Sequence, residues 1–256
     1  MCNDAGVRFV LKFPRITRNN YLQGVLPFLS KGIDLNISGV LVENYGTAHA
    51  LMQATPHIGL FGSGGLNIYN HQSVYQSAPI FRSVTLSPEL SRDEMELLIR
   101  RVRSQGCLTS FSLIVQGNSE AMVSEDCILQ PWEKEVQKNK DRHHPRFYGI
   151  RDSTGHIFPV RVDGECRSHI FNSSELCLID HLPSLLQMGI NEVIIDTRGR
   201  TTGYARDMTG IYAKAISLVH DGIKTPDKRL ELLKDIVKLY ALGGITAGHY
   251  IRGLKE

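Results

Sequence analysis

Short apolar runs recur along the chain, separated by stretches whose apolar residues fall at helical spacing. The runs predict six β-strands, at Arg8–Phe13, Gly39–Val42, Ile58–Phe61, Ser83–Leu86, Ser110–Val115 and Glu192–Ile195. Strands that alternate with helices through short connections form parallel sheets with the helices outside. The pattern therefore predicts an α/β fold.

Two of the stretches between strands carry clear helix signals. In the first, serine caps, a proline and acidic residues open a helix between Ser87 and Glu94, and Gly106 follows its last apolar position. In the second, Thr225-Pro226-Asp227 opens a helix that Gly243-Gly244 closes. Both helices support the alternating pattern.

One region, from Gly117 to His169, breaks this rhythm because it is long, polar and turn-rich. A loop of this length inside a compact domain is usually functional or disordered. Its charged run, Glu133 to Arg142, is more typical of a solvated surface helix than of a binding patch. We expect one domain over residues 1–256, with an inserted loop or subdomain at 118–169 after the Ser110–Val115 strand.

Composition excludes several classes of protein. The formal net charge of +3 does not indicate a nucleic-acid or membrane-surface protein. No apolar run reaches the roughly 18 residues of a membrane-spanning helix, and the first residues lack the pattern of a secretory signal. We therefore expect a cytoplasmic protein without membrane contact. The five cysteines, an odd number, argue against a disulfide framework.

A charged cluster follows the last predicted strand. Asp196 ends that strand, and Arg198 and Arg200 follow it. The carboxyl ends of parallel strands carry the chemistry of α/β barrels and doubly wound sheets. The spacing fits a catalytic cluster and a salt-bridged strand end that only orders a loop equally well. Glu43 and Asn44 follow the second predicted strand in the same way.

The glycine-rich segment Gly62-Ser63-Gly64-Gly65 also follows a predicted strand. Successive backbone N–H groups there could bind an anion, although such segments more often form a tight turn. Because Asn67 and Asn70 come next, we expect the segment to line the open end of the sheet. No HExxH zinc-protease motif is present, and order alone assembles no Ser/His/Asp triad.

Two elements together resemble peptidase family U32, catalogued as collagenase-like peptidases. They are Asn172–Cys177 (NSSELC) and Ile195–Tyr204 (IDTRGRTTGY). The order of the segments along the chain also matches: GVLVENYG, GLNIYN, VTLSPELSRDE, LIVQGNSEAMVSEDC, FNSSELCLIDHLPSLLQMGI and VIIDTRGRTTGYA. The resemblance covers nearly the whole chain. It implies a TIM-like (β/α) barrel with the active face at the carboxyl ends of the strands.

The chain departs from the family barrel at its start, where two βα units precede the counterpart of Arg8–Phe13 in the family. About six of the eight strands of a barrel are therefore expected, as a truncation, a split barrel or an opened sheet. Open edges at Arg8–Phe13 and Glu192–Ile195 would recruit another chain. We expect a homo-oligomer or a partner chain that completes the barrel, with Thr246–Gly253 as the first candidate to cover the sheet otherwise.

The resemblance also implies a metal site, because many family members hold an iron–sulfur cluster with four cysteines. Cys127 and Cys166 match two of these positions, and the other two fall on Glu120 and near Asp141–His144. Candidate additional ligands are Cys177, His143 and His144. Such a set would suit an iron–sulfur cluster or zinc. The alternative, with no metal, leaves Cys177 as a buried small apolar residue.

Two function classes stay open. The first is a family enzyme that hydrolyses peptides, or an iron–sulfur-dependent hydroxylation enzyme that acts on RNA or a small aromatic compound. The expected catalytic residues are Glu43, Glu120, Asp196, Arg198 and Arg200, and the expected substrate-binding residues are Asn44, Asn67, Asn70 and Tyr204. The second class is a non-catalytic subunit or barrel fragment that binds a partner chain.

Overall fold

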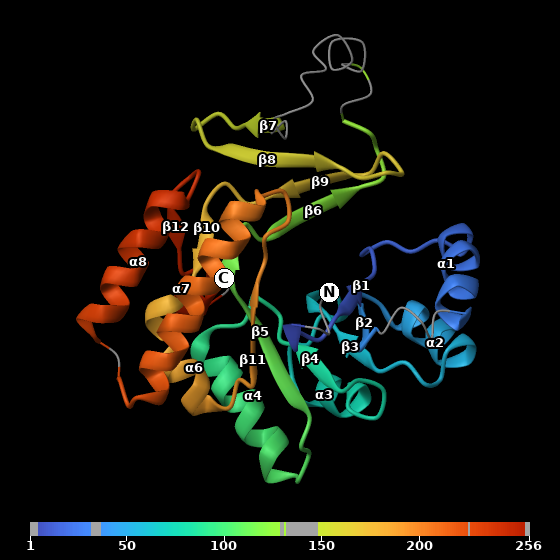
Figure 1. Cartoon of the computed structure of the whole chain (residues 1–256), viewed down its shortest axis with the longest axis horizontal. Coiled ribbons are helices and arrows are strands. Elements are labelled where there is room, and N and C mark those ends of the chain that lie inside the picture. The colour runs from blue at the N-terminus through green and yellow to red at the C-terminus, as the bar shows by residue number, and fades with distance from the viewer. Residues whose placement is uncertain (1–4, 32–36, 129–130, 132–147, 225, 254–256) are drawn as a thin grey trace. The chain divides into compact units, whose positions relative to one another are not determined.

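The computed structural model describes residues 5–31, 37–128, 131, 148–224 and 226–253 (Figure 1). Residue contacts divide the chain into two compact units. The first unit comprises Met1–Leu113, Leu186–Val193 and Gly248–Glu256, and the second comprises Ile114–Leu185 and Ile194–Ala247. The predicted ligands His143 and His144 lie outside the described residues.

Parallel strands form the sheet of the first unit, in the order β1-β2-β3-β4-β5. The strands are β1 (Val10–Lys12), β2 (Gly39–Val42), β3 (Leu60–Gly62), β4 (Ser83–Thr85) and β5 (Ser110–Gly117), of which β5 continues into the second unit. The connecting helices are α1 (Asn19–Lys31), α2 (Tyr45–Ala54), η3 (Gly64–Leu66), α3 (His71–Ser77) and α4 (Arg92–Ser104), and α9 (His249–Arg252) lies near the C-terminus. This alternation confirms the predicted α/β fold with a mainly parallel sheet.

Local sequence explains these elements. Ser91 and Glu94 form a reciprocal capping box at the start of α4, as the sequence predicted. The strands β2 and β4 are almost completely buried, with Val40, Val42 and Val84 fully inaccessible to solvent. Strands buried on both faces need continuous apolar runs, which is why these strands could be recognised in the sequence.

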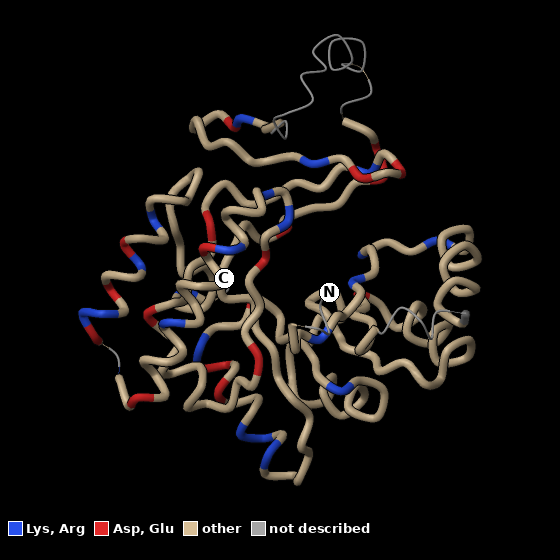
Figure 2. The backbone as a smooth tube through the Cα atoms, viewed as in Figure 1, with Lys and Arg blue, Asp and Glu red and all other residues tan. Residues whose placement is uncertain are grey.

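In the second unit, β10 (Glu175–Cys177) pairs antiparallel with the end of β5, and β12 (Ile245–Thr246) pairs parallel with β10. Strand β11 (Glu192–Ile195), which is divided between the two units, also pairs with β5. The helices of the second unit are η5 (Ile179–His181), α7 (Thr202–His220) and α8 (Lys228–Tyr240), and α6 (Leu182–Met188) begins in it and ends in the first unit. Lysine and arginine alternate with acidic residues along α8 (Figure 2). None of the helices in the described ranges has the length and apolar character needed to cross a membrane.

The apolar runs did not predict β10 and β12. With them, the hydrogen-bonded order contains eight strands in the described part of the chain, and β10 runs against its neighbour β5. The incomplete six-strand barrel is therefore not established. Within the described residues, β1 and β11 each pair on one side, as expected of edges. Thr246, which was expected to cover an edge, pairs with Leu176 of β10.

The expected inserted loop contains most of an antiparallel sheet of four strands, in the order β6-β9-β8-β7. The strands are β6 (Glu120–Ser124), β7 (Tyr148–Arg151), β8 (Ile157–Val162) and β9 (Ser168–Phe171). The turn between β7 and β8 is built on Asp152, whose carboxylate accepts hydrogen bonds from the backbone N–H groups of Thr154 and His156. The polar, turn-rich segment therefore forms antiparallel strands rather than an irregular loop.

Candidate acid–base site

The second unit brings three of the predicted catalytic residues together. Arg198 donates hydrogen bonds to both carboxylate oxygens of Asp196, at 2.6–3.0 Å, and one to Glu120 Oε2 at 2.8 Å. Its guanidinium also lies 5.5 Å from the ring centre of Phe171. The Arg198 side chain remains 33% exposed, while both carboxylates are largely buried. Asp196 and Glu120 thus hold a cation that solvent can reach.

A histidine that the sequence analysis did not single out completes this cluster. The Nδ1 atom of His169 lies 3.1 Å from Glu120 Oε2, and its Nε2 atom lies 3.3 Å from Asp163 Oδ2. The hydrogen bond with Glu120 raises the pKa of His169 above its usual value. Asp163 raises it further, and partial burial opposes both effects. The imidazole is therefore held between two carboxylates and favours its charged form.

Strand register explains why these side chains meet. Glu120 pairs with Phe171, and Val123 pairs with His169. Alternate residues of β9 share one face of the sheet, so His169, Phe171 and Glu120 project together. At the end of β5, Gly117 has φ of +119°, and a Cβ atom there would lie 2.2 Å from the Asp196 carbonyl oxygen. Only glycine permits this close approach, which places Asp196 beside β5.

Arg200 lies in a separate, buried network. It donates to Glu175 Oε2 and to the Tyr240 carbonyl, each at 2.6 Å, and its guanidinium lies 3.8 Å from the Tyr204 ring centre. Glu175 is fully buried and also accepts hydrogen bonds from Gln116 and the Tyr204 hydroxyl. Burial, followed by Glu175, raises the pKa of Tyr204. We interpret Arg200 and Tyr204, predicted as catalytic and substrate-binding, as residues that hold β10 in place.

In the first unit, the Glu43 carboxylate is enclosed by its own neighbours. It contacts Lys12 Nζ at 2.8 Å, accepts a hydrogen bond from Ser63 Oγ at 2.8 Å, and accepts another from the Gly65 N–H at 2.9 Å. A Cβ atom on Gly65 would lie only 2.3 Å from Glu43 Oε2. In this structure, the glycine-rich turn therefore binds the protein's own carboxylate.

The predicted substrate-binding asparagines have mainly structural contacts. Asn44 caps α2 by accepting a hydrogen bond from Thr47 N at 2.8 Å, and Asn70 caps α3 by accepting one from Ser73 N at 3.0 Å. Asn67 adopts a left-handed conformation, with φ of 53°, at the end of η3. Helix capping accounts for the Asn44 and Asn70 side chains, and the end of η3 accounts for the backbone conformation of Asn67.

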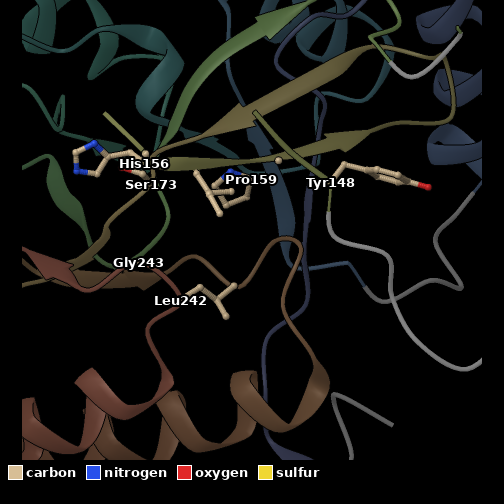
Figure 3. A pocket seen from close by; sticks show the side chains of 9 residues that line it. Tyr148, His156, Pro159, Ser173, Leu242 and Gly243 are labelled. Carbon is tan, nitrogen blue, oxygen red and sulfur yellow. The ribbon is translucent and has the colours of Figure 1, made fainter. Parts of the chain in front are cut away.

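A pocket of about 380 Å³ lies elsewhere in the second unit. The β7–β8 hairpin forms one wall, and the segments at Ser173 and at Leu242–Gly243 form the other. Figure 3 shows Pro159 and Leu242 on opposite sides of this pocket.

Comparison with known proteins identifies the family. The model of peptidase family U32 matches residues 1–255. The chain belongs to peptidase family U32. No curated protein matches it. The solved structure of the U32 peptidase Mk0906 matches with 13% sequence identity and a TM-score of 0.38, over 46% of this chain and 49% of that one. The match thus spans about half the length of Mk0906.

The predicted cysteine ligands of this U32 chain do not lie together, because two form a disulfide and the third is buried in β10. Cys127 and Cys166 form a disulfide, with their Cα atoms 5.1 Å apart. The odd number of cysteines argued against a disulfide framework, and this single bridge was not predicted. Cys177 is buried in β10, 3.9 Å from the Tyr212 hydroxyl, and burial raises the pKa of its thiol. In the described ranges, no three His, Cys, Asp or Glu residues form a group that could hold a metal ion. The metal site stays a prediction.

Proposed function

We propose that this U32 chain hydrolyses peptide bonds at an acid–base cluster made of Glu120, Asp163, His169, Asp196 and Arg198. The observation that supports the proposal most strongly is the position of His169, with each ring nitrogen against a carboxylate and Arg198 on the same Glu120. Peptide hydrolysis needs a base for water, an acid for the leaving amine and a cation for the carbonyl oxygen. The cluster contains all three.

Each residue then has one role. Glu120 takes a proton from water as the water oxygen bonds to the carbonyl carbon. Arg198 stabilises the negative charge that develops on the carbonyl oxygen. His169, whose charged form is favoured by the two carboxylates beside it, donates a proton to the amide nitrogen as the carbon–nitrogen bond breaks. Asp196 and Asp163 position Arg198 and His169.

The described residues do not fit a cubane iron–sulfur cluster. Such a cluster needs four ligands, and the two matching thiols, Cys127 and Cys166, are joined to each other in a disulfide. Cys177 is enclosed beside Tyr212 within the protein core. The proposed reaction therefore has no step through a metal or cluster. Iron, sulfide and zinc analysis of protein prepared without air, with Cys127→Ser/Cys166→Ser as control, tests the separate prediction of a metal.

We also propose that another chain, or a second copy of this one, adds a strand at the edge formed by β1. In the described residues this strand pairs only with β2, and Val7 and Phe9 next to it are exposed. Unpaired strand edges beside apolar side chains favour the addition of another strand. Light scattering on the purified chain tests this, since a monomer at all concentrations would contradict self-association.

The hydrolysis proposal is tested with a mixture of peptides in water enriched in ¹⁸O, read by mass spectrometry. We expect new C-termini that carry one ¹⁸O atom, because the attacking oxygen comes from water. Glu120→Gln should abolish them, while Glu231→Gln, at an exposed position on α8, should not. Absence of cleavage by the wild-type protein, or full cleavage by Glu120→Gln, would show the assignment to be wrong.

A further inference from the structure

The pocket and the acid–base cluster share one face of the four-stranded sheet. Val160 pairs with Ile170, so the same register places Pro159 opposite Phe171. Gly149 of β7 pairs with Pro159 across the other edge of β8, away from β9. Because alternate residues share a face, the pocket residues Ile157 and Pro159 lie on the face that carries Phe171 and His169.

The separation between pocket and cluster is small. Residues directly opposite each other in antiparallel strands have Cα atoms about 4.5–5.5 Å apart, so the Pro159 wall begins one strand away from Phe171. The Arg198 guanidinium lies over that Phe171 ring. Two residues of extended chain span about 7 Å. A peptide that places one side chain in the pocket can therefore present a nearby peptide bond to the cluster.

The opposite wall is fixed to β10. A Cβ atom on Gly243 would lie 2.0 Å from the Ser173 carbonyl oxygen, so the two backbones are in direct contact. Ser174 Oγ donates to the Gly243 carbonyl at 3.2 Å, and Glu175 N donates to the Gly244 carbonyl at 2.9 Å. These contacts hold Leu242 at the edge of the pocket.

The lining selects for apolar groups. Leu242 is 64% exposed and Ile157 is half exposed, and burying such side chains against a ligand is favourable. Among the described residues that line the pocket, none is Asp, Glu, Lys or Arg. Nδ1 of His156 is 2.7 Å from Thr154 Oγ1, which orients the ring. The volume of about 380 Å³ is near the lower end of the range, roughly 300–1,000 Å³, for small-ligand pockets.

We infer that this pocket receives a bulky apolar side chain of the peptide substrate, close to the bond that is cleaved. The inference rests on the proposed peptide hydrolysis and adds the substrate class to it. It makes Leu242, Ile157 and Pro159 specificity-determining residues that contact the substrate side chain.

The kinetic test uses peptides that differ at one residue, with Phe, Leu, Ala or Asp at that position. Wild-type protein should cleave the Phe and Leu peptides with kcat/KM at least roughly tenfold above the Asp peptide, as hydrophobic pockets discriminate. Leu242→Asp should lower the ratio of kcat/KM for the Phe peptide to kcat/KM for the Ala peptide roughly tenfold. Leu239→Asp, at a position 84% exposed on α8, is the matched control and should behave as wild type.

A binding test separates this inference from the proposed hydrolysis. N-acetyl-phenylalaninamide should shift the amide NMR signals of Gly149, Gly155 and Gly243 in the wild-type protein and in Leu239→Asp, but not in Leu242→Asp. Shifts without cleavage of any peptide would refute the hydrolysis and retain the apolar pocket. Cleavage with no preference among the peptides, no effect of Leu242→Asp and no shifts would overturn the pocket and retain the hydrolysis.

Discussion

Replacing Arg200 with alanine should damage the stability of the protein, although its position beside Arg198 in the sequence suggested a catalytic role. Arg200 is 10% exposed and Glu175 is 0% exposed, and they are joined at 2.6 Å. Arg200→Ala would leave the Glu175 carboxylate buried without its cation. It would also remove the donor to the Tyr240 carbonyl and the contact with the Tyr204 ring.

The expected cost follows from this burial. Removing one partner of a buried ion pair typically costs about 3–5 kcal/mol, because the remaining charge stays uncompensated. At about 2–4 °C per kcal/mol for a chain of this size, the melting temperature should fall by about 6–20 °C. The hydrogen bonds from Gln116 and Tyr204 to Glu175 remain and offset part of this cost, so we expect a fall in the lower part of the range.

The assay is thermal unfolding followed by circular dichroism, with urea unfolding as a second measure. Arg206→Ala is the matched control, since Arg206 is exposed and pairs with its neighbour Asp207, and it should leave the melting temperature unchanged. If Arg200→Ala melted like the wild type while peptide cleavage was lost, Arg200 would be catalytic and the structural interpretation would be refuted.

The remaining predictions concern three other sites. The pKa of His169 is raised in the folded protein, so the charged imidazole stabilises the folded state at pH values below the ordinary pKa of 6.5, and this contribution is lost as the pH rises through the folded-state pKa. The melting temperatures of wild type and His169→Asn should therefore differ most near pH 6 and converge at alkaline pH. A difference that does not change with pH would contradict the ion pairs. Gly117→Ala should destabilise the protein by more than about 1 kcal/mol in urea unfolding, because its φ is positive and a Cβ atom would collide with Asp196. Gly210→Ala, inside α7 with open space around it, should instead stabilise the protein by about 0.5–1 kcal/mol, and equal effects of the two changes would refute this reasoning. Burial raises the pKa of Cys177, so iodoacetamide should label this thiol only after unfolding, as mass spectrometry would show; labelling of the native protein would contradict its buried position.

The sequence was informative where short apolar runs form strands. β2, which is almost completely buried, and β11, which is partly buried, begin and end where the apolar runs predicted. It failed for β10 and β12, which have three and two residues and are too short to show a period. β10 also begins with Glu175, a charged residue whose burial depends on Arg200, so local sequence gave no sign of a core strand.

The candidate site was partly predictable for the same kind of reason. Glu120, Asp196 and Arg198 follow or begin strands, so their meeting could be expected from topology. His169 was missed because it lies in a short antiparallel strand within a segment that resembled a loop. The alternation in Ser168–Phe171 after the turn at Asp163 was the available signal, and it identifies a strand without revealing that the histidine faces Glu120.

Hydrolysis by this cluster is tested most directly by kcat/KM for one cleaved peptide, measured side by side for wild-type protein and His169→Asn at neutral pH. We expect cleavage by the wild type and a loss of about 10²-fold or more in the variant, the usual contribution of a positioned acid or base. Both proteins should remain folded by circular dichroism. Equal kcat/KM values for two folded proteins, or no cleavage by the wild type, would contradict the claim that this cluster hydrolyses peptides.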